Sequence, residues 1–139
     1  MGDYDLEFVT SIRNGDMQTL ARLQREGRSM NACNRFGESV LHLAARRGCL
    51  EVMRAMLAGG ASVAVSDDYG RTPLHDACWT SRPRFDVVQL ILDCDVNLLR
   101  VVDSRGVPPL GYIKRDLWAA WAAFLDEVQD RYWGGGPDG

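Results

Sequence analysis

Lysine and histidine are scarce in this sequence of 139 residues, and no run of apolar residues is long. Lys and Arg together number 16 against 19 Asp and Glu, so the formal net charge is −3, and Lys114 is the one lysine. Nucleic-acid-binding proteins gather a surplus of basic residues, which makes that class a poor match. No segment reaches the roughly 18 apolar residues of a membrane span. We therefore expect neither nucleic acid nor a membrane among the ligands.

Cysteine and histidine are too few and too scattered to predict a metal site. The four cysteines form no C-x-x-C pair, and only two histidines are present to complete a ligand set. The acidic opening MGDYDLEF lacks the apolar run of a secretory signal peptide. We therefore expect no metal, and free thiols in a reducing compartment, the cytoplasm or the nucleus.

Catalytic motifs are equally hard to find. His75 and Asp76 are adjacent, and adjacent residues on a helix do not face each other, so they cannot form a dyad by themselves. The phosphate-binding G-x-x-x-x-G-K motif and the metalloprotease H-E-x-x-H motif are both missing. Nothing makes the Gly-rich end of the chain a phosphate loop, and we expect it to be flexible. The sequence therefore predicts no enzymatic activity and no cofactor.

What the sequence does contain is an internal repeat of 33 residues. Residues 15–37 align without a gap on residues 48–70, and SVLHLA at residues 39–44 returns as TPLHDA at residues 72–77. A third copy ends at Gly106 with a period of 36, so it carries an insertion. The insertion falls either in WTSRPRF, before the second helix of that copy, or in VNLLRV, after it. A fourth copy is degenerate.

A 33-residue period with a T-P-L-H-x-A motif is the pattern by which this sequence resembles the ankyrin repeat family, over roughly residues 5–130. The resemblance implies an all-α solenoid of helix-turn-helix units joined by β-hairpin loops. It implies about four units, including divergent terminal caps. The expected boundaries are one domain at 1–133, its units at 5–37, 38–70, 71–106 and 107–130, and a Gly-rich tail at 134–139. The resemblance further implies that His75 ties neighbouring repeats together through hydrogen bonds near the hairpin.

Local chemistry agrees with such helical pairs. Thr72 can cap a helix that then starts with proline, whose missing N–H loses no hydrogen bond there, and Ser39 provides the same cap one repeat earlier. Gly27 and Gly60 are expected to end the second helices with a positive φ angle. Asp95 occupies the matching place in the third copy, so we expect the chain to leave that helix differently.

The last unit differs from the inner repeats. It carries Trp118, Trp121 and Phe124, and terminal repeats must cover the apolar face that a stack otherwise exposes. We expect these three aromatic residues to form a lid on the core rather than a binding platform. The same unit has Gly111 in place of the histidine and no hydroxyl cap, which predicts a looser start to its first helix.

The resemblance also directs attention to a concave binding surface made of hairpin tips and the exposed ends of the first helices. Arg, Tyr and Trp at such places are the residues enriched in binding hot spots. A Trp at position 79 is the most informative, because that position is variable and exposed in the family. The candidate partner-binding residues are Arg35, Phe36, Glu38, Arg46, Arg47, Asp68, Tyr69, Arg71, Trp79, Thr80, Arg105 and Arg115.

These observations predict a non-enzymatic adaptor, monomeric when isolated, that binds an acidic or aromatic segment of a partner protein. Two alternatives stay open: an architectural subunit held permanently in a larger assembly, and an inhibitor of a partner enzyme. An obligate interface would be large and apolar, so the isolated architectural subunit would self-associate. For the adaptor, the competing explanation is that an arginine-rich composition scatters Arg over every surface.

Overall fold

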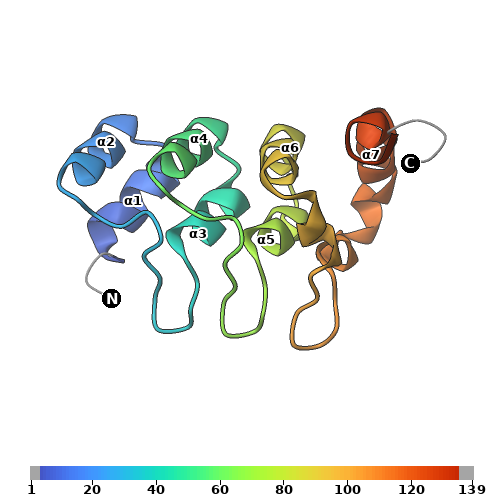
Figure 1. Ribbon diagram of the computed structural model, residues 1–139, viewed down its shortest axis with the longest axis horizontal. Helices are drawn as coiled ribbons and strands as arrows, with labels where there is room; N and C mark the ends of the chain where they lie inside the picture. The colour runs from blue at the N-terminus through green and yellow to red at the C-terminus, as the bar shows by residue number, and fades with distance from the viewer. Residues whose placement is uncertain (1–3, 135–139) are drawn as a thin grey trace.

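The computed structural model describes residues 4–134, and their helices stand in pairs along one axis (Figure 1). The pairs are α1 (Leu6–Asn14) with α2 (Met17–Arg25), α3 (Val40–Arg47) with α4 (Leu50–Ala58), and α5 (Pro73–Trp79) with α6 (Phe85–Cys94). In the described range, regular structure is helical apart from an isolated bridge between Cys33 and Ser39. The predicted all-α repeat fold is confirmed.

The fourth unit departs from this plan. After α6 the chain forms three short 3₁₀ helices, then a long helix and a π-helical turn: η1 (Val96–Arg100), η2 (Pro109–Tyr112), η3 (Arg115–Leu117), α7 (Trp118–Gln129) and η4 (Asp130–Gly134). The four residues of η2 stand where the other units have a first helix. This is the looser start that the missing cap and the missing histidine predicted. Residues 135–139 of the predicted tail lie outside the described range.

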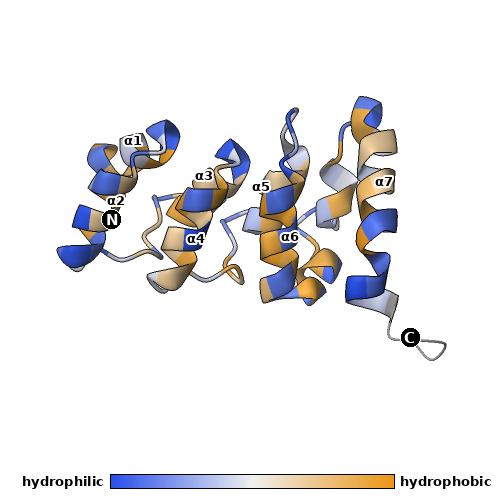
Figure 2. Cartoon of the chain, turned by 90° about the horizontal axis from the view of Figure 1, so that it is seen from above, coloured by the Kyte–Doolittle hydropathy of each residue, from blue (hydrophilic) through white to orange (hydrophobic). Residues whose placement is uncertain are grey.

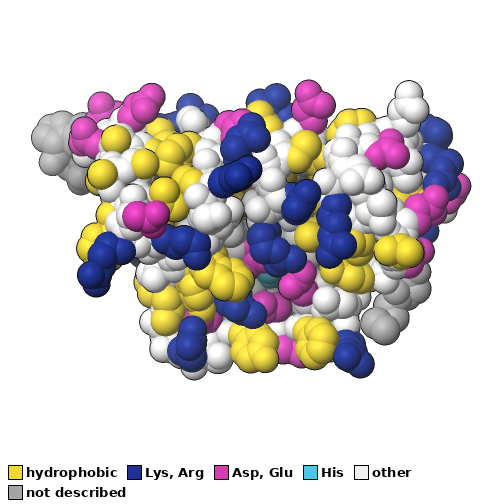
Figure 3. Space-filling view, turned by 180° about the vertical axis from the view of Figure 1, so that it is seen from behind, with side chains coloured by type: hydrophobic (Ala, Val, Ile, Leu, Met, Phe, Trp, Pro, Cys, Tyr) yellow, Lys and Arg dark blue, Asp and Glu magenta, His cyan; other side chains and the backbone are white. Residues whose placement is uncertain are grey.

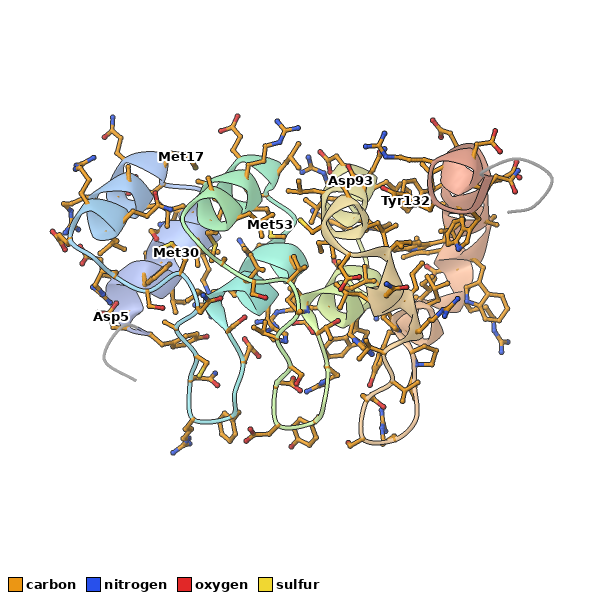
Figure 4. The ribbon with its side chains drawn as sticks, viewed as in Figure 1. Asp5, Met17, Met30, Met53, Asp93 and Tyr132 are labelled. Carbon is orange, nitrogen blue, oxygen red and sulfur yellow. The ribbon has the colours of Figure 1, made fainter. Side chains whose placement is uncertain are left out.

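The core lies between the row of first helices and the row of second helices. Ala44 and Ala77 are buried on α3 and α5, and their small side chains let these neighbouring first helices pack closely. Met53 of α4 is fully buried, and Met30 lies nearby in the loop that follows α2 (Figure 4). Figure 2 shows that α2 is more hydrophilic than α6. The N-terminal unit is thus the more polar end of the stack.

Glycine and aspartate end the second helices in different ways. Gly27 and Gly60 adopt positive φ angles of 83° and 102°, as predicted. Asp95 instead has an extended φ of −163°, and its carboxylate accepts the N–H of Asn97 at 3.0 Å to begin η1. The exit from α6 therefore leads into a 3₁₀ helix rather than a glycine turn.

Both candidate segments share the insertion in the third unit. The buried residues of α4 (Val52, Met53 and Met56) recur in α6 with a spacing of 35, whereas the turn glycines Gly70 and Gly106 are 36 apart. Compared with the basic period of 33, most of the extra chain therefore lies before α6. These extra residues belong to the loop at residues 80–84, between α5 and α6. The remainder follows α6.

Histidine joins the second repeat to the third. Nδ1 of the buried His42 accepts the backbone N–H of Ser39 at 3.1 Å, so this ring nitrogen carries no proton. Nε2 must then hold the proton of the neutral ring, and it donates to the backbone carbonyl of Arg71 at 2.7 Å. Since Arg71 follows the turn of the next hairpin, the imidazole fixes that hairpin against α3.

His75 repeats the arrangement one unit later. Its Nδ1 accepts the N–H of Thr72 at 3.0 Å, and its Nε2 donates to the carbonyl of Val107 at 3.1 Å. The role that the resemblance implied for His75 is confirmed. Burial lowers the pKa of both His42 and His75, which favours the neutral rings that these bonds require.

The aromatic lid is formed by two of its three predicted members. Trp121 and Phe124 are buried, with ring centroids 5.0 and 4.6 Å from that of Phe85 on α6. The prediction for Trp118 is wrong, because its side chain is 57% exposed. At 100° per residue, Trp118 lies about 90° away from the buried stripe of α7. Its indole N–H donates to the carbonyl of Ile113 instead, at 3.2 Å.

The η4 turn that follows α7 is tied to α6 by polar contacts. The guanidinium of Arg131 donates to both oxygens of Asp93 at 2.8 and 2.9 Å, and the hydroxyl of Tyr132 donates to the same carboxylate at 2.7 Å (Figure 4). The bond to Arg131, followed by that to Tyr132, lowers the pKa of Asp93. The last unit is therefore held to α6 both by the aromatic contacts with Phe85 and by these polar contacts with Asp93.

Candidate functional site

Three hairpins project from the helical stack and share one geometry (Figure 1). We call residues 34–38, 67–71 and 103–107 the hairpin tips. Each tip starts with Asn34, Asp67 or Asp103, whose Oδ1 accepts the backbone N–H groups two and four residues further on at 2.9–3.0 Å. Such side-chain-to-backbone bonds fix a turn locally. The backbone at each tip is thus set by its own sequence.

The tips are also bonded to each other. The N–H of Asp68 donates to the carbonyl of Phe36 at 2.9 Å, and the N–H of Ser104 donates to that of Tyr69 at 2.8 Å. His42 and His75 hold the second and third tips in addition, through the carbonyls of Arg71 and Val107. The surface along the tips is therefore pre-formed, and a ligand that binds there orders little additional backbone.

Exposed aromatic rings and arginines are paired at the first two tips. Phe36 and Tyr69 are 52% and 58% exposed. The guanidinium carbon of Arg35 lies 4.9 Å from the Phe36 ring centroid, and that of Arg71 lies 4.8 Å from the Tyr69 centroid. Figure 3 shows hydrophobic and basic side chains along the hairpin edge, at the bottom of the view. The first pair offers a flat apolar surface beside a positive charge, whereas Arg71 of the second pair also forms a salt bridge with Asp67 at 3.2 Å.

Two shallow hollows separate the tips. The first, about 270 Å³, is lined by Phe36, Glu38, Asp67, Tyr69 and Arg71. The second, about 290 Å³, is lined by Tyr69, Arg71, Asp103, Ser104, Arg105 and Tyr112. Tyr69 and Arg71 belong to both, so they form the centre of the candidate site.

Two predicted site residues, Arg46 and Glu38, are engaged with each other inside the structure. Arg46 donates to Glu38 and to Asp76, at 2.8 Å in each case, and so joins α3, the first hairpin and α5. Asp76 is only 5% exposed, and this burial raises its pKa to about 7 against the opposing charge of Arg46. Arg46 is thus occupied by an internal ion pair network rather than turned freely to solvent.

Four predicted residues lie at the ends of the first helices, outside both hollows: Arg47, Trp79, Thr80 and Arg115. Trp79 is 47% exposed, so the loop at residues 80–84 leaves a large part of its ring open. The ammonium of Lys114 lies 5.8 Å from the Trp79 ring centroid. Arg35 and Asp68 stand at the tips themselves. The structure thus divides the predicted set into the hollows, the tips, the Arg46 network and these helix ends.

Tyr112 is a member of the site that the sequence did not reveal. Its hydroxyl donates to Asp103, and its ring packs edge-on against His75 with centroids 5.6 Å apart. That hydroxyl, followed by the N–H of Val107, lowers the pKa of Asp103 to about 2. Asp103 could have been found, because it repeats Asp67. Tyr112 could not, since the fourth copy has lost the repeat pattern.

Comparison with known proteins agrees with this architecture. A family model described as "Ankyrin repeats (3 copies)" matches residues 8–100, which is more than half of the chain. The chain belongs to the ankyrin repeat family. Ankyrin repeats in general mediate protein–protein interaction, and the hairpin tips lie where the resemblance placed the binding surface.

The chain is similar in sequence to several proteins that carry different names. The mouse "Protein phosphatase 1 regulatory subunit 27" is 34% identical over 105 residues, which cover 75% of this chain and 67% of that protein. A "Putative ankyrin repeat protein" of Rickettsia bellii is 33% identical over 81 residues, covering 56% of this chain and 34% of the relative. The Drosophila melanogaster "Neurogenic locus Notch protein" is 30% identical over 105 residues, which are 4% of its length. The chain thus spans about two thirds of the first relative and much less of the others.

The described residues offer neither a membrane-spanning helix nor a metal site. No helix in the described range is both long and apolar enough to span a bilayer. Across residues 4–134, no three or more His, Cys, Asp or Glu side chains are grouped as metal ligands would be. The cysteines are free thiols, with Cys33 and Cys94 exposed and Cys78 buried.

Proposed function

We propose that this ankyrin repeat chain is a non-enzymatic adaptor that binds a partner protein through its hairpin tips and the ends of its first helices. One observation carries the proposal. Phe36 and Tyr69 are exposed aromatic rings, each stacked by an arginine and each set on a backbone that is hydrogen-bonded to the neighbouring tip.

The energetics favour binding at these rings. Solvated aromatic side chains contribute affinity when a partner covers them, and Tyr and Arg are among the residues that dominate binding energy. A pre-formed surface loses little backbone entropy on association, so more of the contact energy appears as affinity. Tyr69, shared by both hollows, is the residue expected to contribute most.

Tyr69→Ala tests the proposal. The partner is first captured with the wild-type chain, identified by mass spectrometry and purified, and its dissociation constant is measured by calorimetry. Truncating a central aromatic hot spot removes about 2 kcal/mol, so affinity should fall about thirtyfold. The midpoint of thermal unfolding should stay the same, because the ring is exposed.

Trp133→Ala is the matched control. Trp133 is also an exposed aromatic residue, 47% accessible, but it lies in η4 at the other end of the chain from the first hairpin. This variant should bind like the wild type. Equal affinities of the wild-type and Tyr69→Ala chains would exclude the hairpin tips as the binding surface.

A second candidate is regulation of an enzyme by the same surface, and the similarity to a phosphatase regulatory subunit favours it. Adding the chain to the catalytic subunit of protein phosphatase 1 should then change its activity toward a phosphoprotein. The Tyr69→Ala variant should do so less. If the phosphatase activity stays the same at a saturating concentration of the chain, this enzyme is not its partner.

A further inference from the structure

Positive charge gathers at the ends of the first helices although the chain as a whole is acidic. The side chain of Arg47, the last residue of α3, donates to the backbone carbonyl of Arg13 near the end of α1 at 3.2 Å. Two exposed arginines from successive repeats therefore lie next to each other. Figure 3 shows Lys and Arg side chains across the middle of one face, above the hairpin edge.

Further arginines lie in the loop at residues 80–84 of the third repeat. Arg84 lies against the end of α3, where its Cγ would be only 2.6 Å from a Cβ added to Gly48. Arg82 is exposed in the same loop, three residues after Trp79. On the other side of that tryptophan, Lys114 lies 5.8 Å from its ring centroid. Arg84 forms a salt bridge with Asp86 at 3.0 Å, so Arg82 is the arginine by which this loop contributes unpaired positive charge.

We call Arg13, Arg47, Arg82, Lys114 and Arg115 the basic band; Trp79 lies beside Lys114, and the guanidinium carbon of Arg115 lies 5.6 Å from the ring centroid of Trp118. None of these five cations forms a salt bridge with a described residue, whereas Arg46 is neutralised by Glu38 and Asp76. An exposed acid, Asp116, directly follows Arg115 in the sequence. The band therefore presents positive charge without salt-bridge partners, and its Lys114 lies beside the half-exposed indole of Trp79.

We propose that the basic band and Trp79 bind an acidic segment of the partner protein, with an aromatic or aliphatic side chain of that segment packed on the indole. This inference rests on the proposed adaptor function and names the chemistry of its partner. Carboxylates of the segment pair with the arginine forks, which accept them in a bidentate manner. The indole of Trp79 supplies apolar contact area beside the Lys114 ammonium.

A protein segment fits this surface better than a nucleic acid does. The neighbouring hairpin tips carry four acids among three arginines, and Glu38 and Asp67 are paired with Arg46 and Arg71, so the positive charge of the band does not continue across the tips. A peptide can place its acidic residues on the band and other residues on the tips. A nucleic acid carries negative charge at every unit and finds no continuous basic surface beyond the band.

The experiment uses three labelled probes and fluorescence anisotropy on the full chain. The probes are a short peptide of alternating Glu and Phe, the same peptide with Lys in place of Glu, and single-stranded oligo(dT). The Glu-Phe peptide should bind, and its affinity should weaken as salt is raised, because exposed charges are screened. Preferential binding of oligo(dT) or of the Lys-Phe peptide would overturn the proposal.

Charge reversals locate the binding. The double variant Arg47→Glu and Arg82→Glu should weaken the Glu-Phe peptide by about a hundredfold, about tenfold for each reversed charge. Arg54→Glu on α4 is the control, because Arg54 is exposed on a second helix and its reversal makes the same change in charge per site. If Arg54→Glu weakens the Glu-Phe peptide as much per reversed charge as the double variant does, the attraction is only long-range. That result would overturn the band as a site.

The captured partner separates this inference from the proposed function. If Tyr69→Ala weakens the partner and the double reversal does not, the adaptor function holds and the acidic-segment inference fails. If neither change weakens the partner, both fail. If both weaken it, the partner spans the tips and the band together, as proposed.

Discussion

Replacing His42 with leucine should destabilise the chain far more than the size of the side chain suggests. Leucine has nearly the volume of histidine but cannot accept the N–H of Ser39 or donate to the carbonyl of Arg71. A buried polar group left without a partner costs about 1–3 kcal/mol, and relaxation of the hairpin offsets part of this cost. We expect a loss of about 3 kcal/mol in the free energy of unfolding.

Urea denaturation followed by far-ultraviolet circular dichroism measures this loss, and the thermal midpoint should fall by roughly ten degrees for a chain of this size. Gln24→Leu serves as a comparison, because Gln24 also bonds to the next repeat, with its side-chain amide 2.9 Å from the carbonyl of Ala55, but is only partly buried. That change should cost about 1 kcal/mol. A loss below about 0.5 kcal/mol for His42→Leu would refute the argument that the imidazole fixes the next hairpin.

Two further predictions concern the lid and the pH dependence. Trp121→Ala should lower the free energy of unfolding by about 3–5 kcal/mol, whereas Trp118→Ala should change it by less than about 0.5 kcal/mol; similar losses would contradict the assigned burial. Burial lowers the pKa of both histidines below 6.5, so their contribution to stability is full above that value and is lost as the pH falls. Burial raises the pKa of Asp76 to about 7, so its protonation below that pH stabilises the fold. Asp76→Asn removes this stabilising protonation, so its free energy of unfolding should fall more steeply than that of the wild type between about pH 7 and 5. Equal slopes would show that protonation of Asp76 does not offset the loss caused by the histidines.

The repeat pattern predicted most of the fold because an ankyrin stack is built from local units. A period of 33, the helical spacing of apolar residues and the turn glycines depend only on nearby sequence, and they placed the three helical pairs. Even the departure at Asp95 could be foreseen, since a residue with a side chain stands where the other copies have glycine. The new exit as a 3₁₀ helix could not, because it depends on how the following loop packs.

The candidate site was only partly accessible to the same reasoning. Exposed positions follow from the repeat, so Phe36, Tyr69 and Trp79 could be proposed from their register. The repeat does not show which charged side chains pair with each other. Arg46 was therefore predicted to be open to a partner, although it lies between two carboxylates. Tyr112 was missed for a related reason, since its place in the second hollow depends on the irregular path of the fourth unit.

The most direct test of the account is amide hydrogen exchange on the chain with and without its purified partner. The account predicts slower exchange in the complex at the hairpin tips, residues 34–38, 67–71 and 103–107, and at the end of α5. The outer helices α2 and α4 should exchange at the same rate in both states. Protection confined to α6 and α7, with unchanged exchange at the tips, would contradict it.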